Sequence, residues 1–437
     1  MTSRRIAFNI LNSVINEGAY LHLALKEGLR CCDSNSAAFI TALTHAAIEN
    51  LKYSDYLLAH FVKGRMHGSI RLILRMGIAE LLMMNTAPYA VIDESVKLTK
   101  EIGKSGLAGF VNGVLRRIDR ERDSLPALPD DDSEYLQVKF GIPRFLADEY
   151  LSQYGRGFTE KMLASANTHM SFRAQYPYTS DEVIARLNAV SEYSDITFEF
   201  GKLDPNAIIP SRGFDATATS LFNDGMLTVQ SESAMLVCRA CKARPGMKVL
   251  DACAAPGGKT AYLASLMQNT GFIQAWELHE NRVKLTNATL SRLGANAACI
   301  RHDATEPMPE RYESFDIVLI DAPCSGFGVS SKPDTYLNRT ESTVREICCT
   351  QKKILDECCK YVKSGGALVY ATCTISRPEN EENVLGFLAE HKEFELEGFS
   401  DMLPVVYADR ASGGMLQLFP HLDSSDGFFI ARMIKKD

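Results

Sequence analysis

Near the middle of the chain, a short and mainly apolar run leads into a dense cluster of small residues. The run spans residues 247–250, and the cluster from Asp251 to Lys259 reads Asp-Ala-Cys-Ala-Ala-Pro-Gly-Gly-Lys. Apolar residues from Ala261 to Met267 then recur at helical spacing. Glycines let a backbone approach a ligand closely, and the first turn of a helix offers free N–H groups. The pattern therefore predicts a strand, a tight turn and a helix that together bind a nucleotide-like ligand.

Two kinds of nucleotide site compete for this turn. A P-loop, the phosphate-binding loop of many nucleotide hydrolases, requires the motif G-x-x-x-x-G-K-[ST]. Residues 258–260 match the end of this motif, and residues 317–321 could form the Walker B strand that accompanies it. However, Cys253 occupies the position of the first glycine. An S-adenosylmethionine site instead needs an acidic residue at the end of the second strand, where it holds ribose hydroxyls. Glu277 meets this requirement. A dehydrogenase fits less well, because the chain has no G-x-G-x-x-G motif.

Two cysteines distinguish these possibilities, because each follows a predicted strand. Cys324 ends the motif Asp321-Ala-Pro-Cys, and Cys373 ends the motif Tyr370-Ala-Thr-Cys. Parallel sheets place ligands at the carboxyl ends of their strands, so both thiols are expected beside the glycine turn. A nucleotide hydrolase has no use for two thiols there, whereas a pyrimidine C5-methyltransferase does. A thiolate that adds to C6 of cytosine makes C5 nucleophilic, and a base must later take the C5 proton.

These motifs resemble those of the NOL1/NOP2/Sun family of RNA cytosine-5 methyltransferases. The resemblance covers Asp251–Lys259, Asp321–Cys324, Tyr370–Thr374 and Asp426–Phe429, and so extends through roughly the second half of the chain. Spacing alone does not decide which cysteine attacks. The resemblance implies that Cys373 is the nucleophile, that Cys324 helps to release the product, and that Asp321 hydrogen-bonds the base edge near N3.

The same resemblance implies S-adenosylmethionine as the cofactor and assigns residues to it. The turn would wrap the methionine part, Glu277 would hold the ribose, Asp303 would contact the adenine amine, and Asp321 would also line the cofactor site. The turn residues in this expectation are Cys253, Ala254, Ala255, Pro256, Gly257, Gly258 and Lys259. A free thiol titrates at about 8.5, so Lys259 is a candidate to lower the pKa of Cys373. Lys332 is a candidate to face an RNA phosphate.

The first part of the chain is predicted to be helical, because apolar residues recur at helical spacing from residue 5 to 120. The stretches 72–82, 90–98 and 110–115 resemble NusB, an RNA-binding helical bundle, and the front domain resembles that of the RsmB (Sun/Fmu) branch, which methylates small-subunit ribosomal RNA. Residues 1–125 carry 16 Lys+Arg and 12 Asp+Glu, a balance of +4, whereas the whole chain has a net charge of −7. A basic front permits phosphate contacts. Arg116, Arg117 and Arg120 can point to solvent on the last helix.

The expected architecture is multidomain: an all-α NusB-like domain over 1–123, a small α+β RNA-binding domain over 133–224, and a Rossmann-like α/β methyltransferase domain over 225–437. Two prolines and an acidic run predict a linker over 124–133. In the middle domain, short strands are expected at 171–174, 197–200 and 207–209. Catalytic-domain strands are expected at 248–251, 272–277, 298–301, 316–320 and 367–370, followed by a late pair at 415–419 and 428–434.

Other features narrow the setting of the protein. No apolar run approaches the roughly 18 residues of a membrane span, and no signal-peptide pattern opens the chain, so a cytoplasmic location is expected. Twelve cysteines in a reducing compartment do not favour disulfides. Cys238 and Cys241 form a lone C-x-x-C without histidine at ligand spacing, so no metal is expected and they are interpreted as small core residues. The pairs at 31–32, 348–349 and 358–359 receive the same interpretation.

The hypothesis is therefore S-adenosylmethionine-dependent methylation of C5 of a cytosine in 16S ribosomal RNA, through a covalent cysteine–C6 adduct. The RNA would be naked or in an early precursor particle, and the protein is expected to be a monomer. Two alternatives remain open: an RNA-binding or ribosome-assembly factor with an inactive catalytic domain, and a transfer-RNA cytosine-5 methyltransferase.

Overall fold

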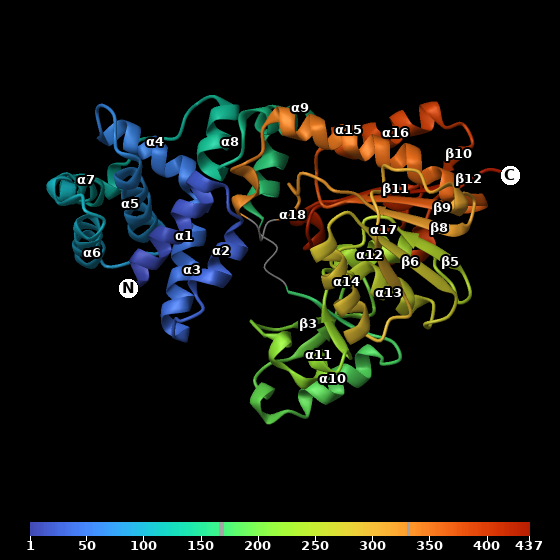
Figure 1. Ribbon diagram of the computed structural model, residues 1–437. Helices are drawn as coiled ribbons and strands as arrows, with labels where there is room; N and C mark the ends of the chain where they lie inside the picture. Colours follow the sequence, from blue (N-terminus) through green and yellow to red (C-terminus); the bar gives the residue numbers. More distant parts are fainter. Residues whose placement is uncertain (166–169, 330–332) are drawn as a thin grey trace. The chain divides into compact units, whose positions relative to one another are not determined.

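The computed structural model describes residues 1–165, 170–329 and 333–437. These residues form two compact units (Figure 1). Unit 1 comprises Met1–Ala164 with the segment Lys332–Glu341, and unit 2 comprises Ser165–Ser331 with Ser342–Asp437. Lys332, the candidate phosphate contact, lies outside the described residues.

Unit 1 is helical, as the sequence predicted. Thr2 and Asp33 cap the helices that follow them through side-chain hydrogen bonds to backbone N–H groups, and Pro88 occupies the first position of its helix. The first seven α-helices are α1 (Ser3–Glu17), α2 (Leu21–Gly28), α3 (Ser34–Glu49), α4 (Leu51–Phe61), α5 (Gly68–Ile78), α6 (Pro88–Glu101) and α7 (Ala108–Arg120).

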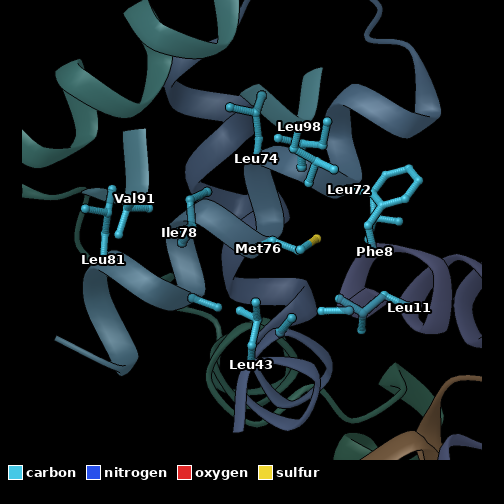
Figure 2. Packing of buried hydrophobic residues seen from close by; sticks show 14 of the residues in the cluster. Phe8, Leu11, Leu43, Leu72, Leu74, Met76, Ile78, Leu81, Val91 and Leu98 are labelled. Atoms are coloured by element: carbon cyan, nitrogen blue, oxygen red, sulfur yellow. The ribbon is translucent and has the colours of Figure 1, made fainter. Parts of the chain in front are cut away.

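One hydrophobic core holds these helices together. Figure 2 shows side chains from α1, α3, α5 and α6 that meet in it, and Leu11, Leu43, Leu74 and Ile78 are fully buried. In α1 the buried positions recur mainly every three or four residues, so this helix turns one apolar face inward, whereas α5 is buried over most of its surface and contacts α1, α3, α4, α6 and α7. The helical bundle predicted from the sequence is therefore present.

Two more helices belong to the same unit, which the expected domain limits did not anticipate. They are α8 (Asp132–Phe140) and α9 (Arg144–Ala164). The Lys52 ammonium of α4 donates to the Ile142 carbonyl at 2.5 Å, and the Tyr56 hydroxyl donates to the Ala127 carbonyl. Leu125 packs against the core of the bundle. The stretch predicted as a linker is thus attached to the bundle, although the division into three functional domains stays a prediction.

Unit 2 contains a small antiparallel sheet with the strand order β2-β3-β1-β4. Its strands are β1 (Phe172–Ala174), β2 (Phe198–Phe200), β3 (Ala207–Pro210) and β4 (Leu227–Val229). The helix α10 (Ser180–Asn188) begins after Thr179, which forms a capping box with Glu182. β4 lies in the stretch expected to open the catalytic domain, but it pairs with β1 and completes this sheet.

The small sheet is joined to the larger part of unit 2 through buried polar side chains. Arg173 is fully buried, donates to the Gln230 side chain at 2.6 Å, and stacks over the Tyr262 ring at 4.6 Å. Burial lowers the pKa of Arg173 to about 10. Gln175 is also fully buried. These residues therefore connect parts of the fold and do not face RNA.

The larger sheet is mixed, with the order β10-β12-β9-β8-β5-β6-β7, and β11 pairs with β12. The five strands from β7 to β9 are parallel, whereas β12 runs antiparallel to β9. This is the Rossmann-like α/β architecture that was predicted; β10 was not predicted. The strands are β5 (Lys248–Asp251), β6 (Phe272–Glu277), β7 (Ala298–Arg301), β8 (Phe315–Asp321), β9 (Val362–Thr372), β10 (Phe394–Leu396), β11 (Met415–Leu418) and β12 (Phe428–Lys435).

Helices cover both faces of this sheet, because successive side chains of a strand point to opposite faces. Along β8, Ile317 and Leu319 join the core with α12 and α13, whereas Val318 and Ile320 join the core with α15 and α16. Figure 1 shows α15 and α16 side by side on one face. The helices are α12 (Glu232–Ala240), α13 (Gly258–Leu266), α14 (Glu280–Arg292), α15 (Glu341–Cys358) and α16 (Glu381–Glu390).

The structure corrects part of the interpretation of the cysteine pairs. Cys238, Cys241, Cys358 and Cys359 are buried, as expected. Four others are not fully buried: Cys31 and Cys349 are exposed, Cys348 is partly exposed, and Cys32 is partly exposed and packs against the core of the bundle. Cys31 and Cys32 lie between α2 and α3, and Cys348 and Cys349 lie on α15. In the part of the chain that the structure describes, no helix is both long and apolar enough to cross a membrane.

Truncation of the core of unit 1 should unfold that unit locally. Leu11→Ala is expected to lower its free energy of unfolding by about 2–5 kcal/mol, because the side chain is fully buried. Hydrogen exchange read by mass spectrometry would show lost protection in α1, α3 and α5. Leu23→Ala, at a position that is 54% exposed, is the control and should change protection little. Equal effects of the two substitutions would contradict this assignment of the core.

Candidate active site

The predicted site residues gather along one edge of the large sheet. β5 lies between β6 and β8, so the strand order reverses at this position, which is where open parallel sheets bind ligands. Asp321 at the end of β8 lies opposite Ala371 of β9, and Asp251 of β5 lies opposite Leu319 of β8. The carboxyl ends of these three strands therefore meet. From β7 to β9, the edge carries in spatial order Asp303, Glu277, the turn 253–259, Asp321 with Cys324, and Cys373.

The glycine turn joins β5 to α13 as predicted. Gly257 has a φ of 98°, a left-handed conformation that favours glycine. A Cβ at this position would also lie 3.2 Å from the Thr286 side chain, whereas an added Cβ at Gly258 would meet no heavy atom within 4 Å. The space above Gly258 is thus open, and α13 begins there with its N-terminal N–H groups. This geometry fits the carboxylate-bearing methionine part of S-adenosylmethionine.

Asp251 anchors the start of the turn from inside the protein. Its side chain is fully buried, and Oδ2 accepts the Thr260 hydroxyl at 2.6 Å. Burial raises the pKa of Asp251 to about 6, although the Thr260 hydroxyl partly opposes this shift. Oδ1 has no hydrogen-bond partner among the described residues. A buried acceptor without a partner is costly, so Asp251 offers an acceptor to whatever occupies the turn.

Lys259 and Asp321 form an ion pair between the turn and β8. The Lys259 Nζ lies 2.6 Å from the Asp321 Oδ2, and 5.3 Å from the centre of the Phe428 ring. Burial acts to lower the pKa of Lys259, but attraction to Asp321, with smaller contributions from Cys238 and Cys373, raises it overall. Lys259 therefore remains a cation whose charge acts on both Asp321 and Cys373.

The two cysteines predicted for catalysis face each other. Their sulfur atoms are 3.0 Å apart, and the Cys373 backbone N–H donates to the Cys324 sulfur at 3.3 Å. The hydrogen bond to Cys373, burial, and the negative charge of Glu379 raise the pKa of Cys324 well above its ordinary value. Cys324 is thus a protonated thiol near neutral pH, and its S–H can donate to the Cys373 sulfur.

Close backbone contacts hold the segment that follows Cys324. The Gly328 N–H donates to the Cys373 carbonyl at 3.1 Å, and the Gly427 N–H donates to the Gly328 carbonyl at 2.8 Å. A Cβ on Gly328 would lie 1.9 Å from the Gly427 carbonyl oxygen, so only glycine fits there. The motif Asp426–Phe429 therefore has a structural reason: it brings β12 against both cysteine loops.

The two acidic residues expected for the nucleoside lie at neighbouring strand ends. Glu277 is 5% exposed, accepts the His279 N–H at 3.0 Å and lies 3.3 Å from an Arg282 guanidinium nitrogen. Asp303 follows β7, and its Oδ1 accepts the Thr305 N–H at 2.9 Å and the Thr305 hydroxyl at 2.7 Å. Asp303 thus shapes a turn. Its contact with the adenine amine stays a prediction.

Sequence reasoning missed a buried carboxylate behind the cysteines. Glu379 is fully buried, and both its carboxylate oxygens accept hydrogen bonds from Ser325. Asn380 is 1% exposed and joins the Thr372 hydroxyl to the Thr374 carbonyl. The sequence offered only an acid and an amide at the predicted start of a helix, which is the ordinary pattern of a helix N-terminus.

Unit 1 carries a separate polar groove of about 770 Å³ along α6 and α7. Lys100, Arg116 and Arg120 line it together with Asp93 and Asp119, and Tyr89 at its side is 81% exposed. The three arginines predicted as a solvent face differ in their surroundings.

Arg117 does not line this groove. It pairs with Glu121 at 3.0 Å and stacks over the Phe61 ring at 5.0 Å. No cluster of three or more His, Cys, Asp or Glu side chains with the geometry of a metal site occurs among the described residues.

Comparisons with known proteins extend over both units. The family model "16S rRNA methyltransferase RsmB/F" matches residues 239–434, and that of the NusB family matches residues 1–120. The probable ribosomal RNA small subunit methyltransferase B of Bacillus subtilis (strain 168) is 34% identical over 445 residues, which are 99% of this chain and 98% of the relative. The corresponding protein of Synechocystis sp. is 29% identical over all of both chains.

Among solved structures, a methyltransferase homologue from Pyrococcus horikoshii superimposes with a TM-score of 0.59 at 27% identity, over 70% of this chain and all of that one. Together with the glycine turn, this likeness shows that S-adenosylmethionine is the cofactor. The NusB model matches the first part of the chain, the methyltransferase model matches the last part, and the full-length relative covers both. The chain therefore belongs to the ribosomal RNA small subunit methyltransferase B family.

Proposed function

We propose that this protein methylates C5 of a cytosine in 16S ribosomal RNA through a transient covalent bond between Cys373 and C6 of the base. The observation that carries the proposal is the pair of thiols 3.0 Å apart, at the carboxyl ends of adjacent parallel strands. The Lys259–Asp321 ion pair lies at the same edge of the sheet. A methyl transfer to nitrogen or oxygen would have no use for two adjacent thiols.

The environment of the thiols supports different roles for them. Cys324 has a raised pKa and stays protonated, so it is poorly suited to attack. Its S–H can donate to the Cys373 sulfur, and a hydrogen bond to a charged sulfur favours the thiolate form. The charge of Lys259 acts in the same direction. These contacts favour Cys373 as the nucleophile.

The reaction needs four changes of bonding. The Cys373 thiolate forms a bond to C6, and the electron density that moves to C5 lets that carbon take a methyl group. S-adenosylmethionine supplies this methyl group from its positively charged sulfur. The C5 proton then passes to water, while the Cys324 S–H is placed to donate to the Cys373 sulfur and so to assist its departure. Finally the C6–sulfur bond breaks, which restores the C5–C6 double bond and the Cys373 thiolate.

Asp321 is suited to hold the base during these steps. Its carboxylate is one-quarter exposed and anchored by Lys259 at 2.6 Å, so one oxygen is fixed and the carboxylate can be directed at the base edge. A base in a structured RNA must leave its stack to reach a buried thiol. The basic groove of unit 1 is the candidate for contacts with the phosphates of the same RNA. A small-subunit RNA substrate also places the reaction in the cytoplasm.

Substitution of each cysteine should separate their roles. Cys324→Ala, mixed with 16S transcript and S-adenosylmethionine, is expected to retain a covalent protein–RNA adduct on a denaturing gel, because the product is not released. Cys373→Ala should form no adduct and lose methyl transfer by about 10³-fold or more, because the nucleophile is gone. Cys349→Ala, at an exposed cysteine outside the site, is the control and should behave as the wild type.

The same gel distinguishes the alternatives. If an adduct forms only with Cys373→Ala, Cys324 is the nucleophile and Cys373 assists release. If the enzyme methylates transfer RNA but neither 16S transcript nor precursor particles, its substrate is transfer RNA. A wild type that binds RNA but transfers no methyl group to any of these substrates would favour an assembly factor with an inactive catalytic domain.

Glu277 provides a test of the cofactor site. Glu277→Gln is expected to weaken the binding of S-adenosylmethionine by about 10-fold, because a charged acceptor for hydroxyl groups becomes a neutral amide. Isothermal titration calorimetry measures this directly. Asp316→Asn is the matched control: Asp316 lies near the other end of β8, where it pairs with Lys363 at 2.8 Å. Equal weakening by both substitutions would argue against a ribose contact.

The unit 1 groove can be tested by salt dependence. Arg116→Ala with Arg120→Ala should weaken RNA binding, and should reduce the slope of log K against log salt concentration by about 2. S-adenosylmethionine binding should not change. Arg117→Ala is the control, because Arg117 is on the same helix but does not line the groove. An unchanged slope in the double variant would exclude phosphate contacts at this groove.

A further inference from the structure

Glu379 lies behind the two cysteines, and its contacts are directed at the loop that carries Cys324. Oε2 accepts the Ser325 backbone N–H at 2.9 Å, and Oε1 accepts the Ser325 hydroxyl at 2.5 Å. Gln351 of α15 donates to Oε2 at 3.1 Å and to the Pro323 carbonyl at 2.9 Å. The residues on both sides of Cys324 are therefore held by one buried carboxylate and the amide that pairs with it.

The same network reaches the loop that carries Cys373. The Ser325 and Thr374 hydroxyl groups are 2.8 Å apart, so the residues that directly follow the two cysteines are hydrogen-bonded to each other. Asn380, the neighbour of Glu379, accepts the Thr372 hydroxyl at 2.5 Å and donates to the Thr374 carbonyl at 3.0 Å. The two loops are thus hydrogen-bonded to each other through buried side chains.

The charge of Glu379 adds an electrostatic effect to this geometry. A carboxylate that is fully buried is costly unless it receives several hydrogen bonds, and among the described residues Ser325 and Gln351 donate to it through three groups. The negative charge of Glu379 is one of the causes that raise the pKa of Cys324, after the hydrogen bond to Cys373 and burial.

We propose that Glu379 is a positioning residue for the release half of the reaction: through Ser325 and Thr374 it holds the Cys324 thiol against Cys373, so that the Cys324 S–H stabilises the departing sulfur as the C5 proton passes to water and the C6–sulfur bond breaks. This inference rests on the proposed covalent mechanism. Formation of the C6–sulfur bond needs only Cys373, whereas release needs both sulfur atoms in register. Loss of the Glu379 charge should therefore slow the second half more than the first.

The test compares two rates in single-turnover experiments with excess enzyme, 16S transcript and S-adenosylmethionine carrying a labelled methyl group. Glu379→Gln is expected to slow adduct release by about 10-fold to 100-fold more than it slows methyl transfer, the range expected for lost hydrogen bonds to a charged group. A methylated protein–RNA adduct should accumulate, attached through Cys373, as with Cys324→Ala. Ser325→Ala and Thr374→Val each remove one hydroxyl group of the network. Each should also slow adduct release more than methyl transfer, but by a smaller factor than Glu379→Gln.

Asp204→Asn is the matched control for lost stability. Asp204 is another buried carboxylate of unit 2, which accepts the Tyr262 hydroxyl at 2.8 Å and pairs with Arg239 at 2.9 Å. The proposal is overturned if Glu379→Gln slows both rates in parallel without an adduct, as a general loss of stability would. It is also overturned if Glu379→Gln does not fold while the Ser325 and Thr374 variants release at the wild-type rate. If Cys324→Ala itself forms no adduct, the covalent mechanism fails first, and the two failures are thereby distinguished.

Discussion

The active site depends on the parallel pairing of β5, β8 and β9. Parallel strands end at the same edge of a sheet, and the pairing register places Asp251, Asp321 and Thr372 at neighbouring positions of that edge. The glycine turn follows the first strand, and one cysteine loop follows each of the other two. A shift in the register of β8 would break the Lys259–Asp321 pair and separate the two sulfur atoms together. The positions of the cofactor turn and of the two thiols therefore both depend on the pairing of these three strands.

Buried polar groups near this edge fix the positions of the cysteine loops, which apolar packing alone does not do. Apolar packing on both faces of the sheet holds the strands, but it does not specify where a loop places one sulfur atom. Glu379 and Asn380 specify that position through directional hydrogen bonds to Ser325 and Thr374. Gly328 allows the Asp426–Phe429 segment to close from the β12 side. The result is a pair of thiols whose sulfur atoms are held 3.0 Å apart, an arrangement that suits the proposed covalent chemistry.

Much of this arrangement could be predicted from local patterns. The apolar runs gave the parallel strands and the turn after β5 to within a few residues, because strand and turn chemistry are local. Predictions were weaker where partners are distant in sequence. The strand β4 was expected to open the catalytic domain, yet it pairs with β1, which lies 53 or more residues earlier in the chain. α8 and α9 followed a proline-rich stretch that resembled a linker, yet contacts from α4 hold them to the bundle. Glu379 looked like an ordinary residue at a helix start.

The sequence by itself determined the chemistry that is available: two thiols, an acid-rich set of strand ends, a glycine turn for S-adenosylmethionine and a helical front domain. It determined these because residue types and short spacings carry them. Only the tertiary structure decided how the thiols differ. Cys324 and Cys373 are 49 residues apart in sequence, and they meet at 3.0 Å because β8 and β9 pair in parallel. That contact and burial, with a smaller contribution from the charge of Glu379, raise the pKa of Cys324 and support the proposal that Cys373 attacks. No local pattern encodes it, because it arises from a hydrogen bond across two strands and a carboxylate from a third segment.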